Sequence, residues 1–370
     1  MALKFDIFCR VVDNYGDIGV CWRLARQLVQ RADVSAVRLW VDDLASFKHI
    51  ASHLRVDEPE QRLEGVTIIH WCGTETRTPA DVVIEAFACS PPAEYLARMT
   101  PHQLWLNLEY LSAEAWIESC HGLPSMQGNG LRKYFFFPGF TQNTGGLLRE
   151  PNLIQDRLAW QADAGKRLDF LAALGVSDTW LRKLEAGAFL AYVYCYPQAP
   201  LPLLIKALAN VGEDALVLMP EGIWPEALPA ISGESAANVG IHRLPFVDQD
   251  AFDRLLWSSE LNIVRGEDSL IRAIWAGRPF VWQPYLQEDD AHLDKLQAWL
   301  DFAALPEPYA ALMQAWNHNA GIDTERLLVD VLRSQALWRQ WQHATEQLCN
   351  RLATQSSLAE RLVDFCTANA

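Results

Sequence analysis

Residues 5–31 read FDIFCRVVDNYGDIGVCWRLARQLVQR, and this stretch decides the fold. Its apolar beginning predicts a buried strand, DNYGDIG predicts a turn, and VCWRLARQLVQR predicts a helix with apolar residues along one face. This order is typical of the start of a nucleotide-binding βαβ unit. A helix N-terminus attracts anions, yet this turn carries the carboxylates of Asp13 and Asp17. The acidic turn therefore needs an explanation other than phosphate binding.

The composition is that of an ordinary globular protein. The chain has 370 residues, of which 50% are hydrophobic and 21% charged, and this length suits two domains. No apolar run approaches the length of a membrane span, and the N-terminus lacks the layout of a signal peptide. We therefore expect a cytoplasmic protein that does not bind a membrane.

Charge and cysteine usage narrow the class of function further. The net charge of −15 argues against nonspecific binding to nucleic acid, which requires clustered lysine and arginine. The eight cysteines are scattered singly, which predicts reduced, buried thiols rather than a zinc site. His49 and His53 are four residues apart on a predicted helix and could share a metal, but a solvated helix face is the commoner explanation. We expect no metal ion.

Strand-like and helical segments alternate along most of the chain, which predicts parallel sheets covered by helices. The pattern loses its strands between residues 151 and 187, and a second alternating set follows. We therefore predict an α/β protein with two Rossmann-like domains facing a central cleft, residues 1–178 and 179–356. The last helix, about residues 357–370, is expected to pack back on the first domain.

The most informative passage of the second domain is IVRGEDSLIRAIWAGRPFVWQPYLQEDDAHLDKLQAWL, residues 263–300. A strand ends at Arg265 and Gly266, and a helix begins near Asp268 and Ser269, either of which could cap it. The N–H groups and dipole of that helix would hold a diphosphate without a metal ion. An ordinary capped helix after a strand explains the same spacing equally well.

This layout resembles the donor-binding half of GT-B glycosyltransferases. More narrowly, FCRVVDNYGDIGVCWRLARQL, LWLNLEYLSAE, FFFPGF and RGEDSLIRAIWAGRPFVWQPY together resemble the EarP family, protein-arginine rhamnosyltransferases of bacterial elongation factor P. The resemblance implies an inverting, metal-independent transfer of rhamnose from dTDP-β-L-rhamnose to one arginine of elongation factor P. It also implies activation of that factor for ribosomes stalled at polyproline. The first domain would hold the acceptor, the second the donor, and we expect a monomer.

The acidic turn then suits a guanidinium rather than a phosphate. Guanidinium has a pKa above ~12 and becomes nucleophilic only when a carboxylate orients it and accepts a proton. Following the family pattern, we assign Asp17 as general base and Asp13 as its orienting partner, although either carboxylate could merely cap the helix or the turn. The resemblance makes Glu267 a catalytic-site residue, where a plain capping role would otherwise be unremarkable.

The resemblance also assigns the nucleotide-sugar site. Asp268 and Ser269 would supply donors to the diphosphate, Arg265 would offer charge to the leaving nucleotide, and the hydroxyl of Tyr285 could donate to phosphate. Phe246 and Gln249 match the family's site for the base, with the thymine stacked on the ring and hydrogen-bonded by the amide. Tyr196 is a weaker candidate for that pocket, and residue patterns alone would place all three in the core or on the surface.

Other functions remain to be weighed against this one. Another GT-B transferase, or a nucleotide-sugar epimerase, could act on a small or lipid-linked acceptor, although no basic or apolar run suits a membrane. A dehydrogenase or Rossmann binding module needs a GxGxxG turn, which DNYGDIG does not provide. Most of the 15 tryptophans should be core, whereas those of LWLNLEYLSAEAW and WIESCHG are expected to border the cleft.

Overall fold

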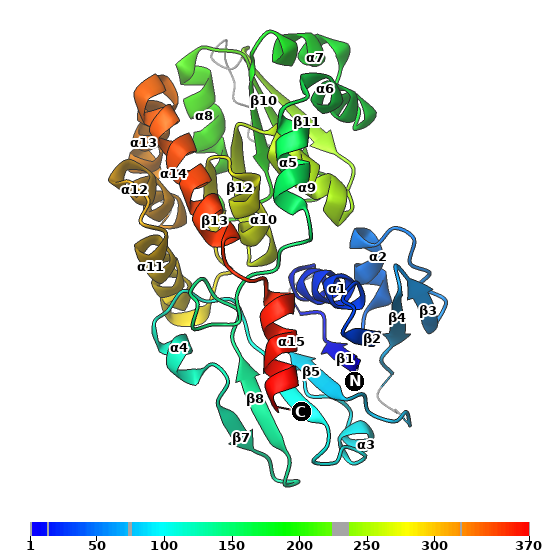
Figure 1. Cartoon of the computed structure of the whole chain (residues 1–370). Helices are drawn as coiled ribbons and strands as arrows, with labels where there is room; N and C mark the ends of the chain where they lie inside the picture. The colour runs from blue at the N-terminus through cyan, green and yellow to red at the C-terminus, as the bar shows by residue number, and fades with distance from the viewer. Residues whose placement is uncertain (1, 13–14, 73–75, 224–236, 319, 370) are drawn as a thin grey trace. The chain divides into compact units, whose positions relative to one another are not determined.

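The computed structural model describes residues 2–12, 15–72, 76–223, 237–318 and 320–369. The chain divides into two compact units, which are described separately below (Figure 1). Unit 1 contains residues 1–151 and 354–370, and unit 2 contains residues 152–353.

Unit 1 is built on a largely parallel sheet in the order β3-β4-β2-β1-β5-β6-β8-β7. Its strands are β1 (Leu3–Cys9), β2 (Val34–Val41), β3 (Glu60–Leu63), β4 (Val66–His70), β5 (Val82–Ala86), β6 (Leu104–Leu108), β7 (Pro124–Met126) and β8 (Arg132–Phe136). The short edge strands β3 and β7 pair antiparallel with their neighbours. The inner strands are mostly apolar because both faces of a parallel sheet are covered, although buried Asp6, Glu85 and Asn107 lie on them.

The helices of unit 1 are α1 (Gly16–Val29), α2 (Leu44–Ile50), α3 (Ala93–Leu96), α4 (Trp116–Cys120) and α15 (Leu358–Asn369). The last of these, α15, packs beside α1 (Figure 1). The core between α1 and the sheet includes Ile7, Leu24 and Leu28, whose side chains are fully buried. Burying an aliphatic side chain of this size contributes roughly 1.5–3 kcal/mol, so this core fixes α1 against β1.

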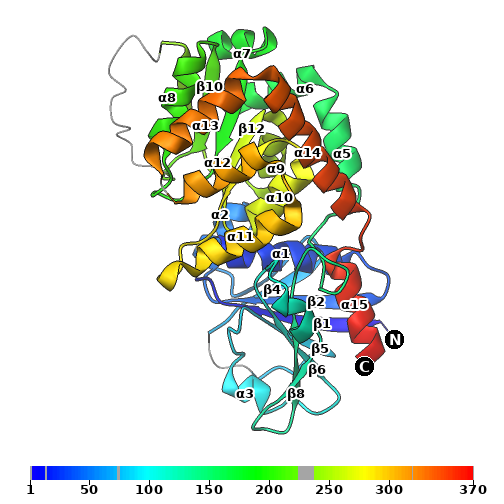
Figure 2. The same ribbon diagram turned by 90° about the vertical axis from the view of Figure 1, so that its left-hand side faces the viewer.

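Unit 2 has a parallel sheet in the order β11-β10-β9-β12-β13. Its strands are β9 (Phe189–Val193), β10 (Ala215–Pro220), β11 (Val239–Leu244), β12 (Leu261–Arg265) and β13 (Phe280–Gln283). Its helices are α5 (Leu153–Gln161), α6 (Ala164–Ala173), α7 (Asp178–Glu185), α8 (Leu201–Val211), α9 (Gln249–Ser258), α10 (Asp268–Ala276), α11 (Ala291–Ala303), α12 (Glu307–Asn317), α13 (Gly321–Arg333) and α14 (Gln335–Ala353), with a short η2 (Glu288–Asp290). Helix α8 packs with α13, and α9 packs with α10 (Figure 2).

The boundary between the units lies at Pro151, not at residue 178 as the sequence suggested. Helices α5 and α6 are tied to other elements of unit 2 by side-chain bonds. Arg157 donates to the carbonyl of Trp275 at 3.1 Å, and Arg167 pairs with Glu260 at 2.9 Å. The strand-poor segment that looked like a crossing is therefore a helical layer of unit 2. The second crossing falls between Ala353 and Thr354, so α15 belongs to unit 1.

Two further expectations are corrected by the structure. The eight cysteines are free and mostly buried, but Cys72 is exposed and Cys120 is only half-buried. His49 lies on α2, whereas His53 lies beyond its end at Ile50, so the two histidines are not on one helix. The Nδ1 atom of His49 contacts the carbonyl of Ala45 at 3.0 Å. Among the described residues, no His, Cys, Asp and Glu side chains group as a metal site would require.

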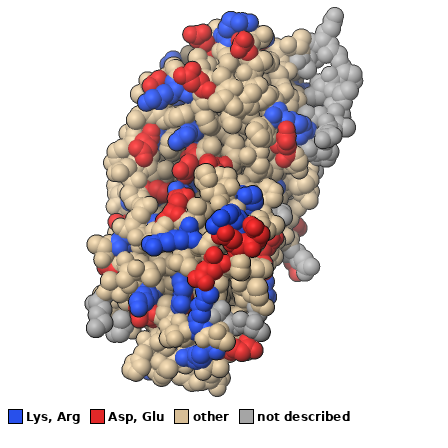
Figure 3. Space-filling model, turned by 90° about the vertical axis from the view of Figure 1, so that its right-hand side faces the viewer, with Lys and Arg blue, Asp and Glu red and all other residues tan. Residues whose placement is uncertain are grey.

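The surface mixes charges of both signs. On the face shown in Figure 3, the side chains of lysine and arginine alternate with those of aspartate and glutamate. Within the described ranges, no helix combines the length and the apolar character needed to cross a membrane.

Candidate functional site

Each sheet has a switch point, where the strand order reverses and ligands of doubly wound folds bind. In unit 1 the chain runs from β1 toward β2 and β4, and then returns to place β5 on the other side of β1. The loops after β1 and β5 therefore flank this point. In unit 2 the chain runs from β9 toward β10 and β11 and returns to place β12 beside β9. The residues after β9 and β12 flank that switch point.

Asp17 lies in the first turn of α1, directly after the loop that follows β1. Its side chain is buried, and its Oδ2 accepts a hydrogen bond from the backbone N–H of Val12 at 2.9 Å. The N-cap of α1 is Tyr15, which makes no side-chain capping bond. Asp17 thus binds back to the chain that follows β1. This structural hydrogen bond does not prevent Asp17 from having a chemical role as well.

Two buried thiols lie close to this carboxylate. Burial raises the pKa of Cys21, and the negative charge of Asp17 raises it further. The pKa of Cys9 is raised by its hydrogen bond with Cys21 and by burial, with a smaller contribution from Asp17. The carboxylate of Asp17 is therefore close enough to two buried thiols for its charge to affect them. Asp13, the expected orienting partner, lies outside the described residues.

The predicted donor residues of unit 2 follow the carboxyl ends of four strands of one sheet. Tyr196 follows β9, Phe246 and Gln249 follow β11, Tyr285 follows β13, and the segment from Arg265 to Ser269 ends β12 and begins α10. Parallel strands place these ends at one edge, so the fold gathers residues that lie far apart in the sequence. Their grouping at this edge is a property of the structure; their individual roles stay predictions.

Arg265 connects the two strands at the switch point of unit 2. Its guanidinium lies over the rings of Tyr194 and Tyr196, with its carbon 4.6 and 4.7 Å from their centroids. It also donates to the carbonyl of Cys195 at 3.3 Å. Tyr196 packs edge-on against Tyr285, whose side chain is exposed, with the ring centroids 5.7 Å apart. This arrangement holds a cation at the sheet edge, where a departing diphosphate would need it.

The turn between β12 and α10 is fixed by backbone contacts. Gly266 has φ of +64°, a left-handed conformation that favours glycine. Its N–H donates to the carbonyl of Gln283 at 2.9 Å, and its carbonyl accepts from Trp282 Nε1 at 2.7 Å. The hydroxyl of Ser269 donates back to the carbonyl of Arg265. The first turn of α10 is therefore held rigidly against β13.

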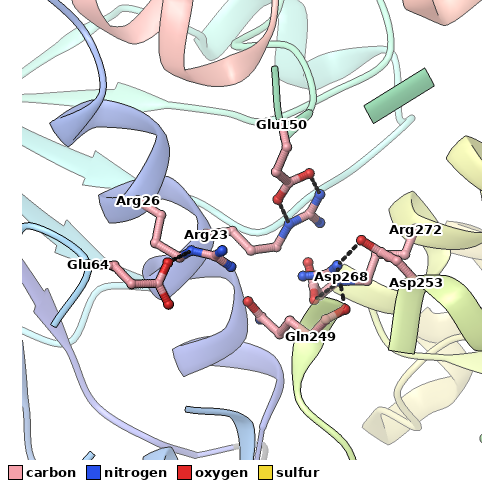
Figure 4. A network of polar contacts seen from close by, with 8 residues as sticks. All are labelled: Arg23, Arg26, Glu64, Glu150, Gln249, Asp253, Asp268 and Arg272. Carbon is pink, nitrogen blue, oxygen red and sulfur yellow. Dashed lines mark hydrogen bonds and ion pairs between the residues drawn. The ribbon is translucent and has the colours of Figure 1, made fainter. Parts of the chain in front are cut away.

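The predicted capping of α10 is wrong. The N-cap is Glu267, which makes no side-chain capping bond, and Asp268 and Ser269 lie inside the helix. Asp268 Oδ2 instead accepts from Arg272 Nε at 2.9 Å, and Arg272 Nη1 also reaches Asp253 Oδ2 at 2.8 Å (Figure 4). The two carboxylates share one buried cation, because Arg272 is only 3% exposed. The acid at this helix N-terminus is thus neutralised internally.

Glu267 is neutralised by a different cation. Its Oε1 accepts from Nζ of Lys295 on α11, and both side chains are largely buried. Arg272 Nη1 also donates to the backbone carbonyl of Gln249 at 3.4 Å, which ties the start of α9 to α10 (Figure 4). Gln249 is 7% exposed, while Phe246 is half-buried. Gln249, one of the predicted base-binding residues, is therefore linked through Arg272 to Asp268 in the first turn of α10.

Sequence reasoning missed three residues of this site. Arg272 lies four residues after Asp268, a spacing at which helical side chains meet, so that pair could have been found. Asp253 and Lys295 come from α9 and α11, and no local pattern connects them with α10. Their roles depend on tertiary packing.

Comparison with known proteins fits this geometry. A family model described as elongation factor P (EF-P) rhamnosyltransferase EarP matches residues 5–367. A protein-arginine rhamnosyltransferase of Pseudomonas putida (strain KT2440) is 44% identical over 99% of this chain and 99% of its own length. One of Neisseria meningitidis serogroup B is 33% identical over 97% of this chain and 96% of its own.

Solved structures agree with the family and the fold. A structure described as the basis for EarP-mediated arginine glycosylation of translation elongation factor EF-P is 32% identical, with a TM-score of 0.66 over 99% of both chains. Arabidopsis thaliana UGT89C1 in complex with quercetin shares 10% identity, with a TM-score of 0.53 over 100% of both chains, which shows the fold alone. The fold is GT-B, as predicted, and the chain belongs to the EarP family of EF-P rhamnosyltransferases.

Proposed function

We propose that this enzyme transfers rhamnose from dTDP-β-L-rhamnose to an arginine of elongation factor P, with inversion at the anomeric carbon. Family membership over residues 5–367 carries the proposal, because relatives named protein-arginine rhamnosyltransferase match almost the whole chain. We further propose that it acts in the cytoplasm as a monomer and thereby activates EF-P for ribosomes stalled at polyproline.

In this mechanism unit 1 supplies the acceptor residues. Asp17 accepts a proton from the arginine guanidinium, whose nitrogen attacks the anomeric carbon of the rhamnose. The bond between that carbon and the diphosphate oxygen breaks as the carbon–nitrogen bond forms. The electron pair leaves on dTDP, and the proton ends on the carboxylate. The buried position of Asp17, fixed by the Val12 N–H, supports this role. We keep Asp13 as a proposed orienting partner.

Unit 2 supplies the donor residues. The N–H groups of α10, the hydroxyl of Tyr285 and the cation of Arg265 stabilise the diphosphate as charge develops on it, and the hydroxyl of Ser269 joins them once it turns away from the Arg265 carbonyl. Internal pairing of Asp268 and Glu267 with Arg272 and Lys295 supports anion binding at this helix, because it reduces repulsion. Glu267 is proposed to contact the sugar or the arginine. Phe246, Gln249 and Tyr196 are proposed to hold the thymine.

The test is the intact mass of EF-P co-expressed with the enzyme. A deoxyhexose increment that fragmentation places on one arginine is expected, and the Asp17→Asn enzyme serves as the matched control. An unmodified EF-P, with dTDP-rhamnose present and the enzyme folded, would refute the proposed reaction. Parallel assays with dTDP-glucose and UDP-glucose test the donor.

The proposed absence of a metal has its own test. A dTDP-sugar should raise the melting temperature of the enzyme equally with and without EDTA, because N–H donors and side-chain cations replace the ion. Loss of that shift in EDTA would contradict a metal-free diphosphate site.

A further inference from the structure

The second loop at the switch point of unit 1 has an unusual backbone. Directly after β5, Phe87, Ala88 and Ser90 have φ of 56°, 55° and 49°, in the left-handed region that non-glycine residues rarely adopt. Such conformations persist only where the surroundings enforce them, and they concentrate at functional sites. This loop neighbours the one that carries Asp17, because β5 pairs with β1.

Specific hydrogen bonds enforce this conformation. The N–H of Phe87 donates to the carbonyl of Leu108 at 2.8 Å, which continues the ladder between β5 and β6. The N–H of Ala88 donates to Oδ1 of the buried Asn107 at 3.0 Å. The loop is thus shaped by the neighbouring strand β6, and the shape sets where the Phe87 ring lies.

The conformation places two aromatic rings together at the sheet edge. Phe87 stacks on Tyr110, which follows β6, with centroids 4.4 Å apart and planes 18° from parallel. Phe87 is half-buried and Tyr110 is 46% exposed. A stacked pair with an accessible side is a flat surface suited to a planar group.

A carboxylate, that of Glu109, immediately precedes Tyr110 in the sequence. Glu109 accepts a hydrogen bond from Nδ2 of Asn107, so Asn107 fixes both Glu109 and the backbone of Ala88. Burial raises the pKa of Glu109 and the nearby charge of Glu85 raises it further, while the charge of Lys133 on β8 and the hydrogen bond from Asn107 lower it by less. A cation bound beside Glu109 would favour its ionised form.

We propose that Phe87, Tyr110 and Glu109 form an arginine shelf, which binds the guanidinium of the acceptor arginine and selects it over lysine. A guanidinium is planar, stacks on aromatic faces and offers several N–H donors to a carboxylate, whereas an ammonium is a compact point charge. The inference rests on the proposed function and deepens it, because it names the residues that recognise the acceptor side chain.

The position of the shelf suits this role. Neighbouring strands lie ~4.8 Å apart, so the loops after β5 and β6 are one and two strands from the loop that follows β1. An arginine stacked on the shelf keeps one terminal nitrogen bound to Glu109 and leaves the other for transfer. The shelf residues bind and orient the guanidinium, and none of them takes its proton.

Steady-state kinetics with purified EF-P and dTDP-rhamnose test the shelf. Phe87→Leu and Tyr110→Leu keep apolar bulk but remove the aromatic face, so each should raise the acceptor KM about fivefold to thirtyfold. The kcat and the affinity for dTDP should stay within about twofold of wild type. Tyr110→Phe keeps the ring and should behave as wild type.

Glu109→Gln gives an independent readout. It should raise the acceptor KM about tenfold, the size expected for loss of one charge-assisted contact. In the wild type the acceptor KM should also rise as the pH falls, because Glu109 becomes protonated, and this rise should flatten in Glu109→Gln. Met126→Ala, at a side chain 67% exposed on β7, and Glu94→Gln on α3 are matched controls that should change neither constant.

The outcomes separate the two proposals. If wild-type enzyme modifies EF-P while Tyr110→Leu and Glu109→Gln both keep the wild-type acceptor KM, the shelf is wrong and the proposed function stands. These two positions decide the matter if Phe87→Leu fails to fold. If instead wild-type enzyme leaves EF-P unmodified, the proposed function fails, and the arginine shelf, which rests on it, fails too.

Discussion

Helices α1 and α10 each follow a strand at the switch point of their sheet, β1 in unit 1 and β12 in unit 2. Each carries a carboxylate in its first turn, Asp17 in α1 and Asp268 in α10. Asp268 is bound by Arg272, a cation it shares with Asp253. Asp17 accepts a hydrogen bond from the backbone N–H of Val12 at 2.9 Å. The first-turn carboxylate is therefore bound by a side-chain cation in α10 and by a backbone N–H in α1.

The largest effect is expected from removing the shared cation of α10. Arg272→Met leaves the carboxylates of Asp253 and Asp268 close together with no shared cation. Breaking a buried ion pair lowers the free energy of unfolding by about 3–5 kcal/mol. Urea unfolding should show this loss in the transition that reports unit 2. Arg272→Lys keeps the charge and should lose less. A Met variant within about 1 kcal/mol of wild type would show that the network is not needed to neutralise the helix.

Asp17→Asn tests the other half of the comparison. If Asp17 is the base, turnover should fall about a hundredfold or more, with affinity for dTDP unchanged. Stability should change little, because the amide oxygen of the introduced asparagine still accepts from the Val12 N–H. Rhamnosylation near the wild-type rate would reduce Asp17 to a residue that closes the turn, and would direct attention to Asp13 or Glu267.

Phe246→Ala addresses the donor unit alone. By analogy with bases stacked on aromatic side chains, it should weaken dTDP binding by roughly 1–3 kcal/mol and leave acceptor KM unchanged. Calorimetric titration of dTDP measures the effect. Titrations that superimpose on wild type would remove Phe246 from the base pocket.

The two sheets could be predicted from sequence because their inner strands are mostly apolar and alternate with helical segments. The short elements α3, α4, β3 and β7 were missed, since three to five residues carry too little periodic signal. In the site, Asp17 could be found because it lies between an apolar, strand-like run and a segment with helical periodicity. The partners of Glu267 and Asp253 could not, because Lys295 and Arg272 meet them only through tertiary packing.

The unit boundary was missed for a related reason. The segment that forms α5 and α6 looks polar and lacks strands, and only contacts such as those of Arg157 and Arg167 show that it belongs to unit 2. Arg157 is 3% exposed although it is charged. A buried arginine in a polar-looking helix is a feature that sequence periodicity does not reveal, because its burial depends on the carbonyl it binds.

The smallest effect concerns the acid stability of unit 1. Burial lowers the pKa of His121 from 6.5 to about 4, helped by the charge of Arg361 on α15. The neutral ring accepts a hydrogen bond from the N–H of Phe137 at 3.0 Å, so the folded state resists protonation. Between about pH 6.5 and pH 4, His121 is therefore protonated in the unfolded chain but neutral in the native state. Stability should therefore fall as the pH drops from about 6.5 to about 4 and be unaffected above this window.

His121→Asn isolates that effect, since an amide oxygen can accept from Phe137 and does not titrate. For a single titrating group, the free energy of unfolding cannot change by more than ~1.4 kcal/mol per pH unit. The change expected for His121 is smaller, because its ring is partly exposed to solvent. Urea midpoints at pH 7 and pH 5 give the measurement, with wild type losing more than the variant. Equal losses in both proteins would mean that His121 titrates normally and that carboxylates alone govern the acid limb of unit 1.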